Sequence, residues 1–165
     1  MRALSLFVAG MLAMSAANAA DKTISKQVSA DPKGEVDITN VAGSVEVTAW
    51  NRPTVDVQGV IGSGVERVDI ASEGSHTIVK VVLPRESGHD GEAKLHIHVP
   101  AASELELNAV SSDFIGTGIT GSQRLKTVSG DVRTDIAQSD VDVKTVSGDV
   151  RIERALAAAE LTEQS

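Results

Sequence analysis

The feature that most constrains this chain is an internal repeat with an 18-residue period in its C-terminal half. The segment Val128–Val132 (Val-Ser-Gly-Asp-Val) returns one period later as Val146–Val150, and a looser copy, Val110–Phe114, stands one period before it. The octapeptides Lys126–Arg133 and Lys144–Arg151 are identical. A fixed period of this length predicts a β-solenoid, in which successive coils stack through parallel strand pairing. At about 3.3 Å per residue, one coil makes a circuit of roughly 60 Å, which holds two or three short strands.

Stacking turns every eighteenth position into a column of similar side chains. Two apolar columns are expected to face inward, one formed by Leu107, Leu125, Val143 and Leu161 and the other by Val110, Val128 and Val146. The Ser-Gly-Asp triplets are expected to form a stacked corner. In such a corner glycine adopts a positive φ and aspartate hydrogen-bonds its own backbone.

Two familiar repeats that fit an 18-residue circuit do not match this sequence. A hexapeptide helix needs an aliphatic residue at every sixth position, yet steps of six from Leu107 reach Asp113, Asp131 and Asp149. Calcium-binding nonapeptide repeats need Gly-Gly-x-Gly-x-Asp, and nothing nine residues from Asp131 or Asp149 repeats the triplet. Both of these solenoid types are therefore excluded.

The chain before the repeats alternates apolar and polar residues, which predicts half-buried strands. The expected strands are 35–39, 44–48, 54–58, 66–71, 77–83, 94–99 and 104–107, separated by breaks rich in Gly, Pro, Asn and Ser. The sequence therefore predicts an all-β fold, β-solenoid-like with 18-residue coils in its C-terminal half and preceded by alternating strands. Residues 20–103 and the repeats at 104–165 are expected to form one domain.

Residues 1–19 have the pattern of a signal peptide. Arg2 gives a positive start, 3–14 are apolar and uncharged, and Ala17-Asn18-Ala19 has the Ala-x-Ala spacing of a cleavage site. A membrane anchor is the alternative, but the apolar run is shorter than the roughly 20 residues that span a bilayer. We expect cleavage after Ala19, export to the periplasm or to the cell surface and medium, and no membrane span afterwards.

Charge and composition narrow the classes of partner. The chain has 15 Lys and Arg against 23 Asp and Glu, and such an acidic surface repels phosphate backbones, which argues against a nucleic-acid partner. It has no cysteine, so backbone pairing and apolar burial alone must hold the fold together. Aromatic residues are scarce, which suits the thin aliphatic core of a stacked fold.

The last residues stay in register with the repeat. Ser165 falls in the column of Ser147, but the Gly-Asp pair that would follow is absent. This pattern predicts a truncated coil. The alternative is a short capping helix over 154–163, a segment rich in Ala, Leu and Glu.

The sequence offers two candidate metal sites, and in both the architectural interpretation is favoured. The column of Asp113, Asp131 and Asp149 resembles the carboxylates of β-helix enzymes or a calcium site, but its repetition fits corner residues better. His96 and His98, two apart on a strand, share one face as zinc or copper ligands can. No cysteine accompanies them, so we interpret them as solvent-facing residues. We expect no cofactor and no catalytic residue.

Two further residue types carry weaker hypotheses. Trp50 is either a carbohydrate-stacking ring or, as we favour, a cap over the first coil. Ser, His and Asp all occur, but Ser129 and Ser147 are repeat positions without a Gly-x-Ser-x-Gly motif, which argues against a hydrolase.

The order of these segments resembles the bacterial putative-adhesin repeat family, a domain of unknown function on exported and envelope proteins. The resemblance rests on two Thr-Val-Ser-Gly-Asp-Val-Arg units, on Val45–Trp50 and on Leu95–Pro100, and it covers most of 23–151. It implies a β-solenoid-like fold without enzymatic activity, and it brings no catalytic or binding residues.

These observations together predict a non-catalytic exported β-repeat protein. Its expected role is that of an adhesin or an envelope binding module whose partner is an envelope protein or a glycan. A periplasmic envelope-homeostasis factor acting through protein contacts is one alternative, and a β-helix enzyme acting on polysaccharide is another. The oligomeric state is left open at this point.

Overall fold

A computed structural model describes residues 22–86, 91–136 and 139–154 of the chain. The described residues form strands and turns without a helix, which confirms the all-β class. They accordingly contain no helix long and apolar enough to cross a membrane. The expected leader at 1–19 and the alternatives for 155–165, a truncated coil or a capping helix, lie outside the described residues.

Most of the strands are short, and two of them are about twice as long as the rest. Their bounds are β1 Lys22–Ser29, β2 Glu35–Trp50, β3 Thr54–Ile61, β4 Arg67–Glu73, β5 His76–Val82, β6 Glu92–Pro100, β7 Glu104–Thr117, β8 Gln123–Ser129, β9 Val132–Ile136, β10 Val141–Ser147 and β11 Val150–Arg154.

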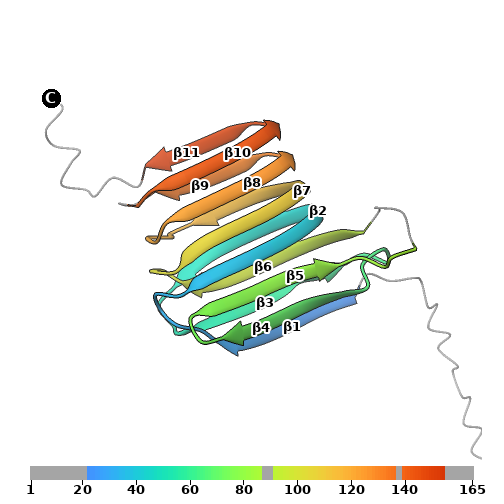
Figure 1. Ribbon diagram of the computed structural model, residues 1–165, viewed down its shortest axis with the longest axis horizontal. Coiled ribbons are helices and arrows are strands. Elements are labelled where there is room, and N and C mark those ends of the chain that lie inside the picture. Colours follow the sequence, from blue (N-terminus) through green and yellow to red (C-terminus); the bar gives the residue numbers. More distant parts are fainter. Residues whose placement is uncertain (1–21, 87–90, 137–138, 155–165) are drawn as a thin grey trace, which may run out of the picture.

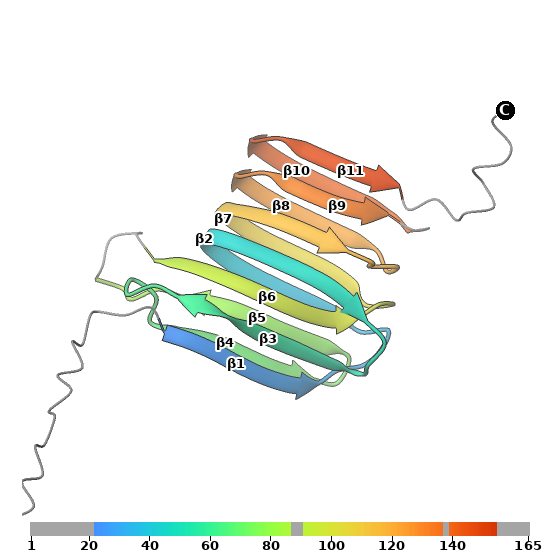
Figure 2. The same ribbon diagram turned by 180° about the vertical axis from the view of Figure 1, so that it is seen from behind.

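The strands lie in two layers that share the long strands β2 and β7 (Figures 1 and 2). The first layer, nearer the viewer in Figure 1, has the order β4, β5, β2, β7, β8, β10. The second layer, nearer the viewer in Figure 2, has the order β1, β3, β6, β2, β7, β9, β11. Because β2 and β7 pass from one layer to the other, the strands form one open 11-stranded sheet folded over on itself.

The C-terminal strands pair in parallel, and each pair is offset by one repeat period. In the first layer Leu107 pairs with Leu125, which pairs with Val143. In the second layer Phe114 pairs with Val132, which pairs with Val150. The N-terminal strands follow other rules, because β1–β3, β3–β6 and β4–β5 are antiparallel pairs. The repeat period therefore sets the pairing of β7 to β11 only.

The core lies between the two layers and is almost entirely aliphatic. Leu107 and Leu125 point inward and are fully buried, as their column predicts, and Val143 is partly buried against the same core. Phe114 is the one aromatic residue of that core among the described residues. Period-two alternation along each strand produces this arrangement, because every second side chain reaches the space between the layers.

Two predicted strand boundaries are wrong. The sequence predicts separate strands at 35–39 and 44–48 and a strand that ends at residue 107. Instead, β2 runs through Ala42-Gly43 as one strand, and β7 runs through Ser111-Ser112. The chain does change layer at both points, since residues before them pair in the first layer and residues after them in the second. A bend that keeps its backbone pairing thus replaces a turn. Strand β1 was not predicted.

Candidate functional site

The column of Val110, Val128 and Val146 faces solvent, which corrects the prediction that it faces inward. These side chains are 48%, 50% and 83% exposed. The reason is the odd spacing from the leucine column: Leu125 and Val128 are three residues apart on the uninterrupted strand β8, so they must point to opposite faces. We call Val110, Val128 and Val146 the valine row.

The valine row lies along a shallow groove on the outer face of the first layer. The groove has a volume of about 360 Å³ and crosses β2, β7, β8 and β10. Thr39, Asn108, Lys126 and Lys144 line it beside the valines. We call this the valine groove. Neighbouring strands in a sheet are about 4.8 Å apart, so the valines form a regular apolar stripe with lysines beside it.

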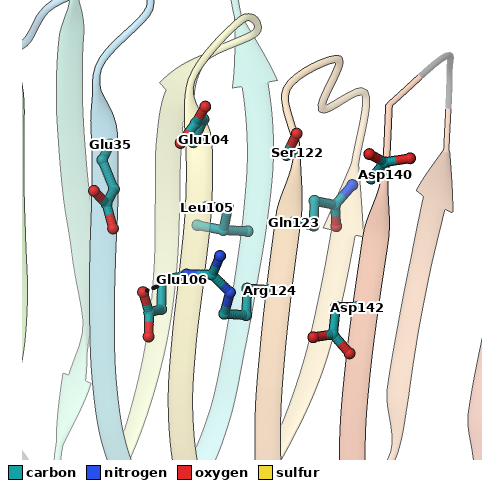
Figure 3. A pocket seen from close by; sticks show the side chains of 9 residues that line it. All are labelled: Glu35, Glu104, Leu105, Glu106, Ser122, Gln123, Arg124, Asp140 and Asp142. Atoms are coloured by element: carbon teal, nitrogen blue, oxygen red, sulfur yellow. Dashed lines mark hydrogen bonds and ion pairs between the residues drawn. The ribbon is translucent and has the colours of Figure 1, made fainter.

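Next to the lysines the same face becomes acidic. Figure 3 shows this region, a hollow of about 220 Å³ near the strand ends. Its outward carboxylates are Glu35, Glu104, Glu106, Asp140 and Asp142. Arg124 lies among them, with its Nη1 3.4 Å from Glu106 Oε2. The outer face of the first layer therefore presents three parallel stripes. They are an acidic stripe formed by these carboxylates, a basic stripe that contains Lys126 and Lys144, and the apolar valine row.

Ion pairs connect the acidic and basic stripes. Lys126 Nζ lies 3.6 Å from Glu106 Oε1, and Lys144 Nζ lies 3.6 Å from Asp142 Oδ2. The hydrogen bond from Asn108, with the charges of Lys126 and Arg124, lowers the pKa of Glu106. These pairs are exposed, so they orient the side chains more than they stabilise the fold.

Asp37 lies beside Glu106 on the neighbouring strand and is partly buried. Burial and then the negative charge of Glu106 raise the pKa of Asp37. Its Oδ1 atom is buried and has no hydrogen-bond partner among the described residues. The ionised form of Asp37 is therefore disfavoured in the folded chain.

Hydrogen bonds along the aspartate column join each sequence repeat to the next. Asp113 Oδ1 accepts a hydrogen bond from the backbone N–H of Asp131 at 2.9 Å, and Asp131 Oδ1 accepts one from the N–H of Asp149 at 3.0 Å. The prediction that each aspartate bonds its own backbone is thus wrong, because the bond crosses to the following coil. One oxygen of each accepting carboxylate is engaged in holding the corner.

The glycines of the corner have the predicted positive φ, 127° at Gly130 and 135° at Gly148. A Cβ at Gly130 would lie 2.4 Å from the carbonyl oxygen of Ser112, in the coil beneath. The identical threonines support the same corner, since Thr127 Oγ1 donates to Ser129 O and Thr145 Oγ1 donates to Ser147 O. The repeated residues therefore act together as a stacked corner.

The two strand histidines lie on β6 and face outward, each beside a carboxylate of a neighbouring strand. His96 Nδ1 lies 3.2 Å from Glu46 Oε2, and His98 Nδ1 lies 3.8 Å from Asp56 Oδ2. Among residues 22–86, 91–136 and 139–154, no three His, Asp or Glu side chains gather closely enough to hold a metal ion. His89 and Asp90 lie outside the described residues.

Trp50 ends β2 and is surrounded by side chains. His98 stacks on its ring with a centroid distance of 4.9 Å, and the guanidinium of Arg52 lies 5.1 Å from the ring centroid. The indole N–H donates to Thr54 O at 2.8 Å. A ring with these contacts has a structural role, and it offers less open surface to a sugar than a free aromatic platform.

The serines of the repeat lie apart from the histidine strands. Ser129 pairs with Ser111 on one side and with Ser147 on the other. The described histidines belong to β5 and β6. The structure thus places the repeat serines and the histidines on different strands.

Sequence reasoning missed one more unit of the corner motif. Val41–Val45 (Val-Ala-Gly-Ser-Val) lies beside Val110–Phe114, with Gly43 paired to Ser112 and Val45 to Phe114. Gly43 has a φ of 111°, as the corner glycines do. The sequence does show its Val-x-Gly-x-Val spacing, but this unit does not lie a multiple of 18 residues before the other copies, so the repeat period does not reveal it. This unit extends the valine groove onto β2.

Comparisons with known proteins give fold-level likeness. No protein-family model matches the sequence, and no curated protein matches it. The chain is similar to the crystal structure of a putative cell adhesion protein from Clostridium sporogenes, with a TM-score of 0.57 and 10% identity over 82% of this chain and 100% of that one. A putative adhesin from Bacteroides fragilis gives a TM-score of 0.32 and 8% identity over 82% and 95%. At 10% identity the first likeness shows a shared fold.

Proposed function

We propose that this chain is a non-catalytic binding module of the cell envelope or cell surface, and that the valine groove is its contact face. The observation that carries this proposal is the row of exposed valines, one on each of three neighbouring strands. Contiguous exposed apolar side chains mark interaction surfaces more often than isolated ones do.

The shape of the groove favours a macromolecular partner. Small molecules bind in clefts that enclose most of their surface, whereas this groove lies on one face of a single layer. Covering the exposed part of each valine contributes about 1 kcal/mol, which supports a weak contact that gains strength by repetition. Apolar valines beside lysines suit a protein surface with aliphatic and acidic side chains better than they suit a carbohydrate.

The conspicuous carboxylates support the non-catalytic part of the proposal. Asp113 and Asp131 each accept a backbone hydrogen bond that holds the corner. A glycosidase needs two carboxyl groups that flank a bond in the substrate. Each of these carboxylates is held in a corner, and the next carboxylate of the column lies one coil away. This arrangement is poorly suited to cleaving a glycosidic bond.

The location and the coil architecture belong to the same proposal. The leader pattern at 1–19 supports export, and the 18-residue pairing offset of β7 to β11 supports a solenoid-like stack. The Clostridium sporogenes structure, which shares the fold, is described as a putative cell adhesion protein. An adhesive role for this chain agrees with that name.

A binding assay with matched variants tests the proposal. Labelled chain is incubated with isolated cell envelopes, and bound label is measured for the Val110→Ser/Val128→Ser variant and for a Val60→Ser/Ile115→Ser control. The control residues are 38% and 43% exposed and belong to the second layer. Each pair removes two exposed aliphatic side chains, so both should fold alike.

We expect the groove variant to lose at least about tenfold in affinity, as loss of two apolar contacts implies, and the control to bind as the wild type does. Equal binding by the two variants would refute the groove as the contact face. Capture of periplasmic proteins alone would favour the envelope-homeostasis role. New reducing ends released from polysaccharide would overturn the non-catalytic assignment.

A further inference from the structure

The far end of the stack, formed by β10 and β11, leaves core positions uncovered. Val150 and Ile152 are 41% and 44% exposed, although Val132, one coil earlier in the column of Val150, is 1% exposed. Val143 is also only partly buried, whereas Leu125 beneath it is fully buried. These side chains point between the layers, and no further strand covers them among the described residues, which end at Arg154.

Backbone and charged groups are open at the same end. Within the described part of the chain, β10 pairs only with β8 and β11 only with β9, so one edge of each strand is unpaired. Asp113 and Asp131 accept an N–H from the coil that follows, and no such coil follows Asp149 among the described residues. An open sheet edge of this kind is a template for another strand.

The positions that face each other across the two layers can be read from the preceding coil. There Thr134 Oγ1 on β9 hydrogen-bonds Gln123 Oε1 on β8 at 2.5 Å. Because the next coil repeats this arrangement one period later, Val141 on β10 is opposite Ile152 on β11. By the same reasoning Val143 is opposite Val150. The two uncovered strands run in opposite directions, since the chain reverses at the corner between them.

We propose that two copies of this chain associate through these ends, each β10 pairing antiparallel with the β11 of the second copy. The two copies are related by a two-fold axis that runs parallel to the strands. Rotation about this axis brings the two ends face to face and places the first layer of one copy beside the second layer of the other. Strand direction is kept by this rotation, so β10 meets a strand of opposite direction. The register of this pairing follows from the same rotation. A residue of β10 pairs with the residue of the second copy's β11 that has the same number as its own opposite residue across the layers.

In that register the apolar and charged side chains are complementary. Val141 meets Ile152 of the second copy, and Val143 meets Val150 of the second copy. On the outer faces Asp142 meets Arg151 of the second copy, and the two-fold axis repeats this pair. Oppositely charged residues directly across antiparallel strands stabilise the pairing.

A second charge pair adds to the first. Lys144 meets Asp149 of the second copy, which gives the open carboxylate of Asp149 a cationic partner. One like-charged pair, Asp140 with Glu153 of the second copy, opposes the association at the strand ends. Glu153 lies 4.0 Å from Arg133 of its own chain, which weakens that repulsion. The balance of charge therefore favours association.

The two-fold arrangement allows a charge-swap test. Arg151→Glu places a glutamate opposite Asp142 in both pairs of a homodimer, and Asp142→Lys places a lysine opposite Arg151. Each variant alone should therefore dissociate. A mixed dimer contains one copy of each variant. In one of its two pairs the native Asp142 faces the native Arg151, and in the other pair the substituted glutamate faces the substituted lysine. Both pairs then have opposite charges, so the mixture should form a heterodimer.

The mass of the purified full chain, measured by light scattering and sedimentation over a range of concentrations, reports the outcome. We expect a wild-type dimer, a dissociation constant raised at least about tenfold in each variant, and a heterodimer in the mixture. Arg67→Glu is the matched control, because it reverses the charge of an exposed arginine on β4, at the other end of the sheet, and should leave the dimer intact.

Three results would overturn the proposal. They are a monomeric wild type at every concentration, variants that remain dimeric, and two dissociated variants that fail to combine. The variants leave the valine row unchanged, so this proposal and the proposed function can fail separately.

Discussion

Substituting alanine for Gly130 tests the stacked corner most sharply. At this glycine φ is +127°, which L-residues rarely adopt, and an added Cβ would lie 2.4 Å from the carbonyl oxygen of Ser112. Gly74 is a matched control, because its φ of +62° is also left-handed but nothing lies within 4 Å of an added Cβ. Both substitutions thus place alanine at a positive φ, but only the one at Gly130 also brings its Cβ against a backbone atom.

The expected magnitudes follow from these two contributions. Left-handed strain alone should destabilise the Gly74→Ala variant by about 1 kcal/mol. At Gly130 the strain is about 1–3 kcal/mol, and moving a backbone carbonyl that belongs to the stacked corner adds about 1–3 kcal/mol more. We therefore expect a total of roughly 2–6 kcal/mol, a large part of the roughly 5–15 kcal/mol typical of a domain.

Urea unfolding of both variants, followed by circular dichroism, measures the difference. At about 3 °C per kcal/mol for a chain of this size, Gly130→Ala should also lower the melting temperature by roughly 6–18 °C. Gly74→Ala should lower it by only a few degrees. If Gly130→Ala were no more destabilising than Gly74→Ala, the close stacking of the corner would be incorrect.

Two further predictions concern carboxylates. Asp131→Ala should lower the free energy of unfolding by about 1 kcal/mol, because it removes the hydrogen bond from the Asp149 N–H, while Asp131→Asn keeps an acceptor and much of that stability. Calcium should leave the melting temperature of the wild-type chain unchanged, and a large calcium-dependent rise that Asp131→Asn abolishes would point to a metal site instead. Asp37→Asn should stabilise the fold at neutral pH, because the raised pKa of Asp37 means that its ionised form is disfavoured in the folded state. This gain in stability should disappear when the pH falls below 3.8, the ordinary pKa of the group, because the carboxyl is then protonated in both the folded and the unfolded chain. A gain that persists in acid would assign it to something other than charge.

Much of the fold was predictable because simple periodicities dominate it. Alternation identified most strands, and the identical octapeptides identified columns that do pair, as Leu107 does with Leu125. The antiparallel strands of the N-terminal half were harder, since period-two patterns are alike for parallel and antiparallel pairing. The bend in β2 was missed because Ala42-Gly43 was interpreted as a chain break, and the bend in β7 was missed because that strand was predicted to end at residue 107.

The candidate site was predictable in its residues but not in its orientation. The valine column was visible in the sequence, and the error lay in assuming that conspicuous apolar residues face the core. Counting from Leu125 to Val128 along one strand would have shown that both cannot be buried. The cross-coil bond of Asp131 could not be foreseen, because its donor belongs to another coil.

Thiol labelling of single-cysteine variants tests the central claim about the valine groove. The chain has no cysteine, so Val128→Cys and Ile115→Cys each introduce one thiol, on the outer faces of the first and second layers. We predict that both thiols react quickly in the free chain and that binding to cell envelopes slows labelling in the Val128→Cys variant alone. A thiol at position 128 that is unreactive in the free chain, or equally reactive when the chain is bound, would contradict the account.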